Sequence, residues 1–282
     1  MASDESLQLG QTLHAAVQRS TKPAVVLAVG SGKGGVGKTT VSVNLAVALA
    51  RQGAAVGLLD ADVYGPNVPL MLGVTQLPPL QEGQIVPATA HGVKFISMGF
   101  FLKPDEPVIW RGPMLHGVIQ KFLKEVLWGP LDYLLVDLPP GTGDVQLTLS
   151  QTIPLTGAVI VTTPQDVALL DVRKAMAMFE KVRVPLIGII ENMSTFVCPS
   201  CRTETPIFRR GGGRAAAERA KVPLLGEIPL VPSVCEHGDA GTPIVAAEPD
   251  SAVAKAFTAA ARQVADRART LAAEGSPQFV GL

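Results

Sequence analysis

The stretch GSGKGGVGKTT, residues 30–40, constrains the possible folds of this chain more than any other feature. From Gly32 to Thr39 it fits the pattern G-x-x-x-x-G-K-S/T, between an apolar run at 24–30 and a helical pattern at 39–53. In that context the glycines let backbone N–H groups point at an anion, and the start of the helix adds positive potential. The sequence therefore predicts a phosphate-binding loop at a strand-to-helix junction; a glycine-rich turn that binds no nucleotide is the alternative.

Each residue type in this loop has an expected task. We expect the Lys38 ammonium to neutralise the β and γ phosphates of a nucleotide, and the Thr39 hydroxyl to ligate Mg²⁺. The loop backbone would hold the phosphates through its N–H groups. The predicted nucleotide ligands in this segment are Gly32, Gly34, Gly35, Val36, Gly37, Lys38, Thr39 and Thr40.

Alternating short apolar runs and longer amphipathic stretches indicate the fold class. Near-continuous apolar runs suit strands that are buried on both faces of a parallel sheet, and helical patterns such as residues 166–182 lie between them. We therefore predict a doubly wound α/β fold, with a mainly parallel sheet flanked by helices and with sites at the carboxyl ends of the strands. The predicted strands lie at 24–30, 55–60, 133–139, 157–164, 186–193 and 222–229.

Length and charge bound the organisation of the chain and its partners. We predict a single domain at 22–275, preceded by an arm or short helix at 1–21 and followed by a tail at 276–282. The 24 basic and 24 acidic residues cancel, no apolar run approaches the roughly 18 residues of a membrane span, and the start lacks the features of a signal peptide. We expect a cytoplasmic protein with neither a nucleic acid nor a membrane as its partner.

Carboxylates follow two of the predicted strands, at the edge where the phosphate loop is expected. LLDADVYGPN places Asp60 and Asp62 at the end of the strand at 55–60, and LLVDLPPGTGD places Asp137 at the end of a later strand. We expect Asp137 to support Mg²⁺, Asp62 to orient the attacking water, and the Gly141 N–H to contact the γ-phosphate. A capping or turn role is the alternative for Asp60 and for Asp62.

Three segments together carry a resemblance to a known group of proteins. KGGVGKTT, DADVYGPN and DLPPGTGD resemble the deviant-Walker-A ATPases typified by MinD, ParA and nitrogenase iron protein, which are P-loop NTPases. The resemblance implies that Lys33, the early lysine of the loop, reaches across a nucleotide-sandwich dimer to the phosphates of the partner subunit. A cation that arrives only on assembly suits the charge that develops on a transferred phosphoryl group. A solvated loop lysine is the alternative.

The segment ENMSTFVCPSCRTETPIF carries a second resemblance. It places Cys198 and Cys201 in a loop near 194–207, beyond the predicted strand at 186–193. In their order of motifs, residues 22–250 resemble the Mrp branch, also called ApbC or Nbp-type proteins, which are P-loop carriers or scaffolds for iron-sulfur clusters. The resemblance implies that the two thiols bind a labile 4Fe-4S cluster and that apo iron-sulfur proteins receive it.

The number of cysteines gives a separate reason to expect a homodimer. An iron-sulfur or zinc site needs about four protein ligands, and one Cys-x-x-Cys pair supplies two. Two copies related by a twofold axis supply four, so we expect the cluster to bridge the subunits. Two alternatives stay open: a thioredoxin-like redox pair, and a zinc site within one chain from Cys198, Cys201, Cys235 and His237.

Contacts to the nucleotide base are expected on two other segments. Asn192, near the end of the strand at 186–193, matches an asparagine that contacts adenine in the resembled family; a structural strand cap is the alternative. Pro229, with the stretch 230–232, would wall the base. The chain has no Asn-Lys-x-Asp guanine signature, which favours ATP over GTP.

Three classes of function follow from these motifs. We favour an ATP-hydrolysing iron-sulfur cluster carrier with slow, switch-like turnover, in which the nucleotide state controls how tightly the bridging cluster is held. A positioning ATPase of the MinD or ParA type would predict a membrane-binding helix or a basic DNA-binding face, and neither is evident in the sequence. An electron-transfer reductase similar to nitrogenase iron protein would place its cysteines on two separate segments, whereas Cys198 and Cys201 are paired.

Overall fold

The structure is a computed structural model that describes residues 25–102 and 112–274. Its centre is a nine-stranded sheet in the order β3-β4-β2-β5-β1-β6-β7-β8, with β9 paired to β7. The strand pairs are parallel, except that β3 with β4 and β7 with β8 are antiparallel. The strands are β1 (Val25–Ser31), β2 (Val56–Asp60), β3 (Ala88–Ala90), β4 (Val93–Ser97), β5 (Tyr133–Asp137), β6 (Gly157–Thr162), β7 (Leu186–Val197), β8 (Glu204–Thr205) and β9 (Leu224–Leu230).

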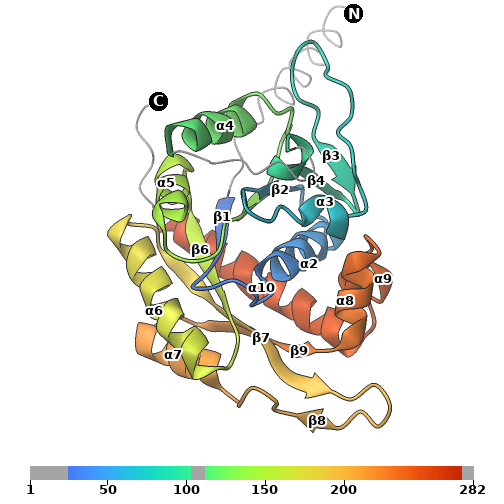
Figure 1. Ribbon diagram of the computed structural model, residues 1–282, viewed down its shortest axis with the longest axis vertical. Coiled ribbons are helices and arrows are strands. Elements are labelled where there is room, and N and C mark those ends of the chain that lie inside the picture. Colours follow the sequence, from blue (N-terminus) through green and yellow to red (C-terminus); the bar gives the residue numbers. More distant parts are fainter. Residues whose placement is uncertain (1–24, 103–111, 275–282) are drawn as a thin grey trace, which may run out of the picture.

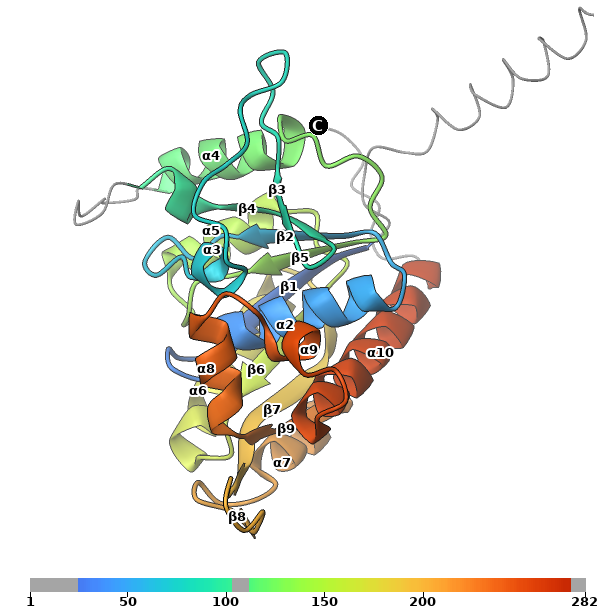
Figure 2. The same cartoon turned by 90° about the vertical axis from the view of Figure 1, so that its right-hand side faces the viewer.

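Helices cover both faces of this sheet (Figures 1 and 2). The apolar side chains of α2 and α10 pack on one face, and those of α4, α5, α6 and α7 pack on the other. This arrangement confirms the predicted doubly wound α/β fold. The helices are α2 (Lys38–Arg51), α3 (Val68–Met71), the 3-10 helix η1 (Met98–Phe100), α4 (Gly112–Lys124), α5 (Asp144–Thr152), α6 (Asp166–Lys181), α7 (Gly212–Ala220), α8 (Pro232–Asp239), α9 (Ile244–Ala247) and α10 (Ala252–Ala273).

The central strands are buried on both faces, which explains their continuous apolar sequences. Every residue of β1, β2, β5 and β6 is buried. Side chains of a strand alternate between the faces, so Leu27 and Val29 pack with α2 and α10, while Val26 and Ala28 pack with the helices of the other face. Each of the six predicted strands is present.

Parallel strands bring the segments that follow them to one edge of the sheet. β1 lies between β5 and β6, and β5 lies between β1 and β2. In the strand register, Asp137 is level with Val29 of β1 and with Asp60 of β2. The phosphate loop after β1 and the carboxylates after β2 and β5 therefore meet at the carboxyl edge, as the sequence predicts.

Short antiparallel additions differ from the predicted pattern. Residues 88–97 form the β3–β4 hairpin at one edge, and β7 continues to Val197, where it pairs with β8. Strands of two or three residues are too short to give a periodic signal in the sequence. The predicted arm at 1–21 and tail at 276–282 lie outside the described residues. Of the helices in the described ranges, none is long and apolar enough to cross a membrane.

The contact of α10 with the core can be tested at Phe257, whose side chain is fully buried among residues of α2 and the sheet. We expect Phe257→Ala to lower the free energy of unfolding by about 3–5 kcal/mol, because it removes apolar contacts and leaves a cavity. The exposed Arg262 in the same helix provides the control, and Arg262→Ala should change it by less than about 0.5 kcal/mol. Urea unfolding followed by circular dichroism measures both; similar losses in the two variants would contradict this account of the core.

Candidate functional site

The phosphate loop joins β1 to α2 in a backbone shape that depends on its glycines. Gly35 and Gly37 both have φ of +78°, in the left-handed region that favours glycine. A Cβ atom on Gly32 would lie 2.3 Å from the backbone of Asp171 in α6, so only glycine permits this close approach. The Gly37 carbonyl accepts a hydrogen bond from the Val41 N–H at 2.9 Å, which starts α2. This is the geometry expected of a loop whose N–H groups bind phosphate.

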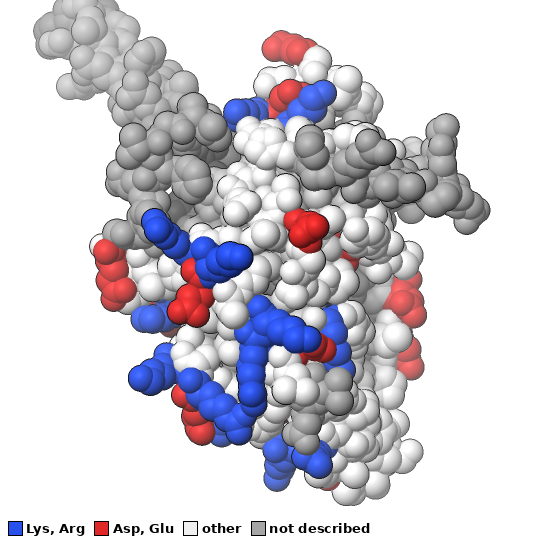
Figure 3. All heavy atoms as spheres, turned by 60° about the vertical axis from the view of Figure 1, so that its left-hand side comes forward, with Lys and Arg blue, Asp and Glu red and all other residues white. Residues whose placement is uncertain are grey.

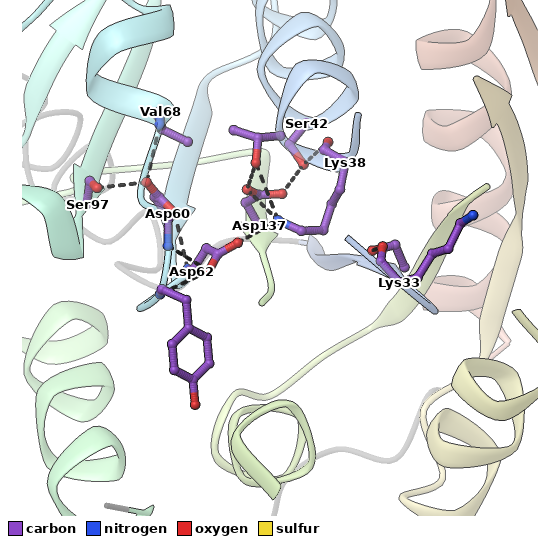
Figure 4. Close-up of polar contacts among 12 residues, drawn as sticks. Lys33, Lys38, Ser42, Asp60, Asp62, Val68, Ser97 and Asp137 are labelled. Carbon is purple, nitrogen blue, oxygen red and sulfur yellow. Dashed lines mark hydrogen bonds and ion pairs between the residues drawn. The ribbon is translucent and has the colours of Figure 1, made fainter. Parts of the chain in front are cut away.

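Lys38 and Asp137 form a buried ion pair at the base of the loop (Figure 4). Nζ of Lys38 donates to Oδ2 of Asp137 at 2.8 Å and lies 3.6 Å from Oδ2 of Asp62. The Thr39 hydroxyl donates to the same Asp137 oxygen at 2.7 Å, and the Ser42 hydroxyl donates to Oδ1 at 2.6 Å. The structure thus brings together four predicted residues and adds Ser42, which lies one helical turn after Lys38 on the inner face of α2.

Asp60 is held in place by hydrogen bonds from neighbouring elements. Its carboxylate is fully buried and accepts from the Ser97 hydroxyl at 2.7 Å and from the N–H groups of Asp62 and Val68 at 3.2 and 3.3 Å. Burial, and secondly the nearby Asp137 carboxylate, raise the pKa of Asp60 to about 7. These contacts fix the turn after β2 and join β2 to β4 and to the first residue of α3.

Asp62 uses its two oxygens differently. Oδ1 accepts from the N–H groups of Tyr64 and Gly65 at 3.1 and 3.3 Å, which forms a turn, the alternative role for this residue. Oδ2 faces the Lys38 ammonium. Burial raises the pKa of Asp62, although the Lys38 charge acts against this. A turn role and a position beside the site of chemistry are therefore compatible in this residue.

Lys33 and Gly141 are engaged outside this cluster. Nζ of Lys33 donates to Oε1 of Gln165 at 3.2 Å, and Figure 4 shows the side chain pointing away from Lys38. The Gly141 N–H donates to the Ser31 carbonyl at 3.1 Å. A contact between Gly141 and a γ-phosphate would require that hydrogen bond to be exchanged, and Lys33 would have to leave Gln165 to reach any phosphate.

A cleft of about 750 Å³ extends from the phosphate loop, including Thr40, along α3 and α8. Its volume lies in the range of sites for small molecules and cofactors. Asn192 and Pro229, the two predicted base contacts, both line it. The amide nitrogen of Asn192 donates to the Val36 carbonyl at 2.9 Å, so this residue also supports the phosphate loop.

The paired cysteines lie in a compact turn between β7 and β8. The Cys198 N–H donates to the Thr203 carbonyl at 3.1 Å, and the Arg202 N–H donates to the Cys198 carbonyl at 2.8 Å. Sγ of Cys201 lies 3.2 Å from the Thr203 hydroxyl; hydrogen bonds from Thr203, and secondly from Cys198, lower the pKa of Cys201 to about 7. The turn therefore presents two free thiols, one half-buried and one exposed, with thiolate, the form that binds metals, accessible near neutral pH.

Ligands for a complete metal site are not gathered within one chain. In residues 25–102 and 112–274, no three His, Cys, Asp or Glu side chains are grouped so that they could hold a metal ion. Cys235 is exposed on α8 with Asp239 at 3.7 Å, and His237 contacts Glu248 at 3.0 Å. The alternative zinc site that joins Cys235 and His237 to the paired cysteines is thus not formed.

The net charge of the chain is zero, but positive charge is concentrated on one face. Figure 3 shows Lys and Arg side chains gathered on the face where α6 and α7 lie side by side. Some are paired, as Lys174 is with Asp171 and Arg214 with Glu227. The expectation that no nucleic acid binds depended on net charge, and it stays a prediction. The exposed basic residues of this face are Arg173, Lys174, Lys181, Arg183, Arg214, Arg219 and Lys221.

The glycine loop after β1, the Lys38–Thr39 pair and the carboxylate at the end of β5 define a P-loop NTPase in a doubly wound sheet. The chain belongs, more narrowly, to the NUBPL iron-transfer P-loop NTPase family of the ParA group, whose family model matches residues 22–265. Both resemblances inferred from the sequence are confirmed.

Curated relatives cover most of the chain. The iron-sulfur cluster carrier protein of Synechocystis is 55% identical over 248 residues, which make up 86% of this chain and 70% of that protein. The Escherichia coli protein of the same name is 52% identical over 244 residues, 86% of this chain and 65% of its own length. An Arabidopsis thaliana iron-sulfur protein required for NADH dehydrogenase is 51% identical over 241 residues, which make up 85% of this chain and 77% of that protein. This chain therefore spans 65–77% of these relatives' lengths.

Solved structures agree with the fold. A nucleotide-binding protein from Archaeoglobus fulgidus, in complex with ADP, superposes with a TM-score of 0.73 at 38% identity, over 85% of this chain and 94% of that one. The cell-division ATPase MinD of Pyrococcus furiosus superposes with a TM-score of 0.65 at 27% identity, over 86% of this chain and 99% of the MinD chain. The P-loop fold is thus shared with both.

The Ser97 contact gives a pH-dependent prediction for the nucleotide-free protein. The Ser97 hydroxyl lowers the pKa of Asp60 by favouring its charged form, so its loss penalises the ionised carboxylate. Because the folded pKa of Asp60 is raised to about 7, this penalty grows as the pH rises through that value. We expect Ser97→Ala to lower the free energy of unfolding by roughly 1–2 kcal/mol near pH 8, and by less near pH 6. Urea titrations at both pH values measure it; an equal loss would contradict the assignment.

Proposed function

We propose that this protein is an ATP-hydrolysing carrier that holds a labile 4Fe-4S cluster between two copies of itself and transfers it to apo iron-sulfur proteins. One observation carries the proposal: a single chain combines a P-loop site with a preformed turn that presents two thiols and lacks further ligands within the described residues. The family and the names of the curated relatives support the same activity.

The cluster is the cargo of this protein, and its coordination explains the homodimer. A 4Fe-4S cluster binds about four thiolates, and each chain offers Cys198 and Cys201 from one turn. A twofold axis near the turn would bring both pairs together. A cluster held by exposed turns of two separable chains can be released when the chains part, which suits a carrier.

The nucleotide site fits Mg²⁺ and ATP through the residues that now surround Asp137. When ATP enters, Lys38 would move its ammonium from the carboxylate to the phosphates, while the loop N–H groups hold the phosphate oxygens. The Thr39 hydroxyl and Asp137 would then hold Mg²⁺, which offsets phosphate charge when it is bound. Asp62, whose Oδ2 already faces this point, would orient the attacking water.

The position of Lys33 supports the proposal that turnover is slow. In a single chain this lysine rests on Gln165, away from the other catalytic groups. Across a dimer it would supply the cation that meets the charge developing on the transferred phosphoryl group. Hydrolysis would therefore depend on assembly, and nucleotide state would in turn control how the two chains hold the cluster.

Anaerobic reconstitution with iron and sulfide tests the cargo. We expect about four irons and four sulfides per dimer, seen by visible absorption, chemical analysis and native mass, because two thiol pairs complete the ligand set. The Cys198→Ala/Cys201→Ala variant should lose the cluster. Cys235→Ala removes the third cysteine, which lies on α8, and should keep the cluster. A monomer, or a dimer that binds only zinc or no metal at the pair, would contradict the carrier function.

Lys33→Ala tests the contribution of the second subunit to hydrolysis. Because Lys33 lies outside the Lys38–Asp137 cluster, we expect Mg-ADP affinity to stay within about threefold, while steady-state ATP hydrolysis falls at least about tenfold. The exposed lysine of α6 offers a control, and Lys174→Ala should hydrolyse ATP like the parent protein. Unchanged hydrolysis in Lys33→Ala would show that this lysine is only a solvated loop residue.

A further inference from the structure

β7 joins the two sites of this chain, and one of its residues departs from strand geometry. The strand runs along the nucleotide cleft and ends directly before Cys198. Met193, inside the strand, has a φ of +56°, in the left-handed region. The pairing of β7 with β9 also shifts register between Asn192 and Phe196. The strand is therefore kinked at a point between the nucleotide cleft and the cysteine turn.

This kink lies against the phosphate loop. The Asn192 amide donates to the Val36 carbonyl at 2.9 Å, and Cε of Met193 lies 3.6 Å from the place that a Cβ on Gly37 would occupy. Asn192 and Met193 line the cleft together with the loop. A nucleotide that reshapes the phosphate loop would therefore act on the two residues that form the kink.

The strand is held much more firmly before the kink than after it. Before it, β7 pairs with β6 and β9, and the buried Glu191 carboxylate accepts a hydrogen bond from the Gly213 N–H at the start of α7. After it, β7 keeps one register pair with β9, Phe196 with Leu230, and β8 pairs with its last two residues, while every residue at 199–207 is exposed. Figures 1 and 2 show this cysteine hairpin, residues 194–207, projecting from the sheet. A change at Met193 would thus move the exposed part of the hairpin, residues 199–207, more than the sheet.

We propose that Met193 is the hinge through which a nucleotide in the P-loop site sets the orientation of the cysteine hairpin. A left-handed conformation is unfavourable for a residue with a side chain, so the kink persists only while its surroundings hold it. The phosphate loop is part of those surroundings. The hydrogen bonds within the turn keep Cys198 and Cys201 together, so the hinge would reorient both thiols as a unit. This inference rests on the proposed function and names the route of its regulation.

The test follows the reactivity of the thiol pair in the full chain. Cys235→Ala, made first, leaves Cys198 and Cys201 as the reactive thiols, since the chain has three cysteines. The rate of alkylation by a maleimide is measured with and without Mg-ADP and Mg-ATP. We expect at least one of the two nucleotides to change the rate about fivefold in this parent protein. Met193→Gly should reduce that change to less than about twofold. Glycine adopts left-handed and other backbone conformations with similar ease, so the phosphate loop could no longer set one backbone conformation at this position.

A matched control separates the hinge from a general effect of adding glycine. Lys221 also has a left-handed φ, +54°, but it lies at the end of α7 and does not line the nucleotide cleft. Lys221→Gly should keep the full nucleotide effect on alkylation. If Met193→Gly fails to fold, Met193→Ala, which loses the Cε contact near Gly37, takes its place. Met193 variants that respond to nucleotide like the parent would overturn the proposal.

Two binding measurements on the same samples separate this inference from the proposed function. Mg-ADP affinity is measured by calorimetry, and Co²⁺ binding by the thiol pair is measured by its visible absorption. A parent protein that fails either measurement contradicts the proposed function, and the hinge falls with it. A parent protein that binds both ligands, but whose alkylation rate ignores nucleotide, overturns the hinge alone.

Discussion

The buried Lys38–Asp137 ion pair is the interaction on which the nucleotide site depends. It ties the first turn of α2 to the end of β5, and two hydroxyls complete the hydrogen bonds of the carboxylate. Removing one partner of such a pair leaves an uncompensated buried charge, which typically costs about 3–5 kcal/mol. In the proposed function, a phosphate that takes Lys38 would leave the Asp137 charge without its cation unless Mg²⁺ replaced it. On that proposal, nucleotide and Mg²⁺ would favour each other's binding.

The sequence predicted those parts of the site that depend on local patterns or on parallel strand order. The phosphate loop is contiguous, Asp137 ends β5 and Asp62 lies two residues after the end of β2, so their meeting at one edge follows from the fold class. The partnership of Asp60 with Ser97 was not predictable, because it depends on β4 lying beside β2, which no local pattern specifies. Ser42 was missed for a different reason: a serine inside a helix carries no distinctive signal until its partner is known.

Contacts that require a second molecule are a further limit on what can be predicted. Local sequence patterns do not specify them, and a single chain does not contain them. Lys33 lies on Gln165, away from the phosphate cluster, and the thiols of Cys198 and Cys201 supply about half of the ligands that a cluster requires. On the proposed function, each feature is incomplete in the monomer for the same reason. One twofold association would complete both, so the nucleotide site and the cluster site would share a single requirement.

A dimer that completes both sites would not by itself let ATP control how the cluster is held. A ligand shifts a conformational equilibrium only by the difference in its affinity for the two states, so ATP and ADP must favour different arrangements of the thiols. The six residue-to-residue steps from Asn192 to Cys198 span about 20 Å as extended chain, which is enough to connect the cleft to the turn without any other element. β7 is mostly buried up to its kink and mostly half-buried beyond it, and the exposed residues begin at 199 in the turn that carries Cys201, so the first part of the strand can sense the phosphate loop while the turn has more room to move. Nucleotide could then act on the cluster along β7 alone. The first part of this strand contacts the phosphate loop, and its end leads directly into the cysteine turn.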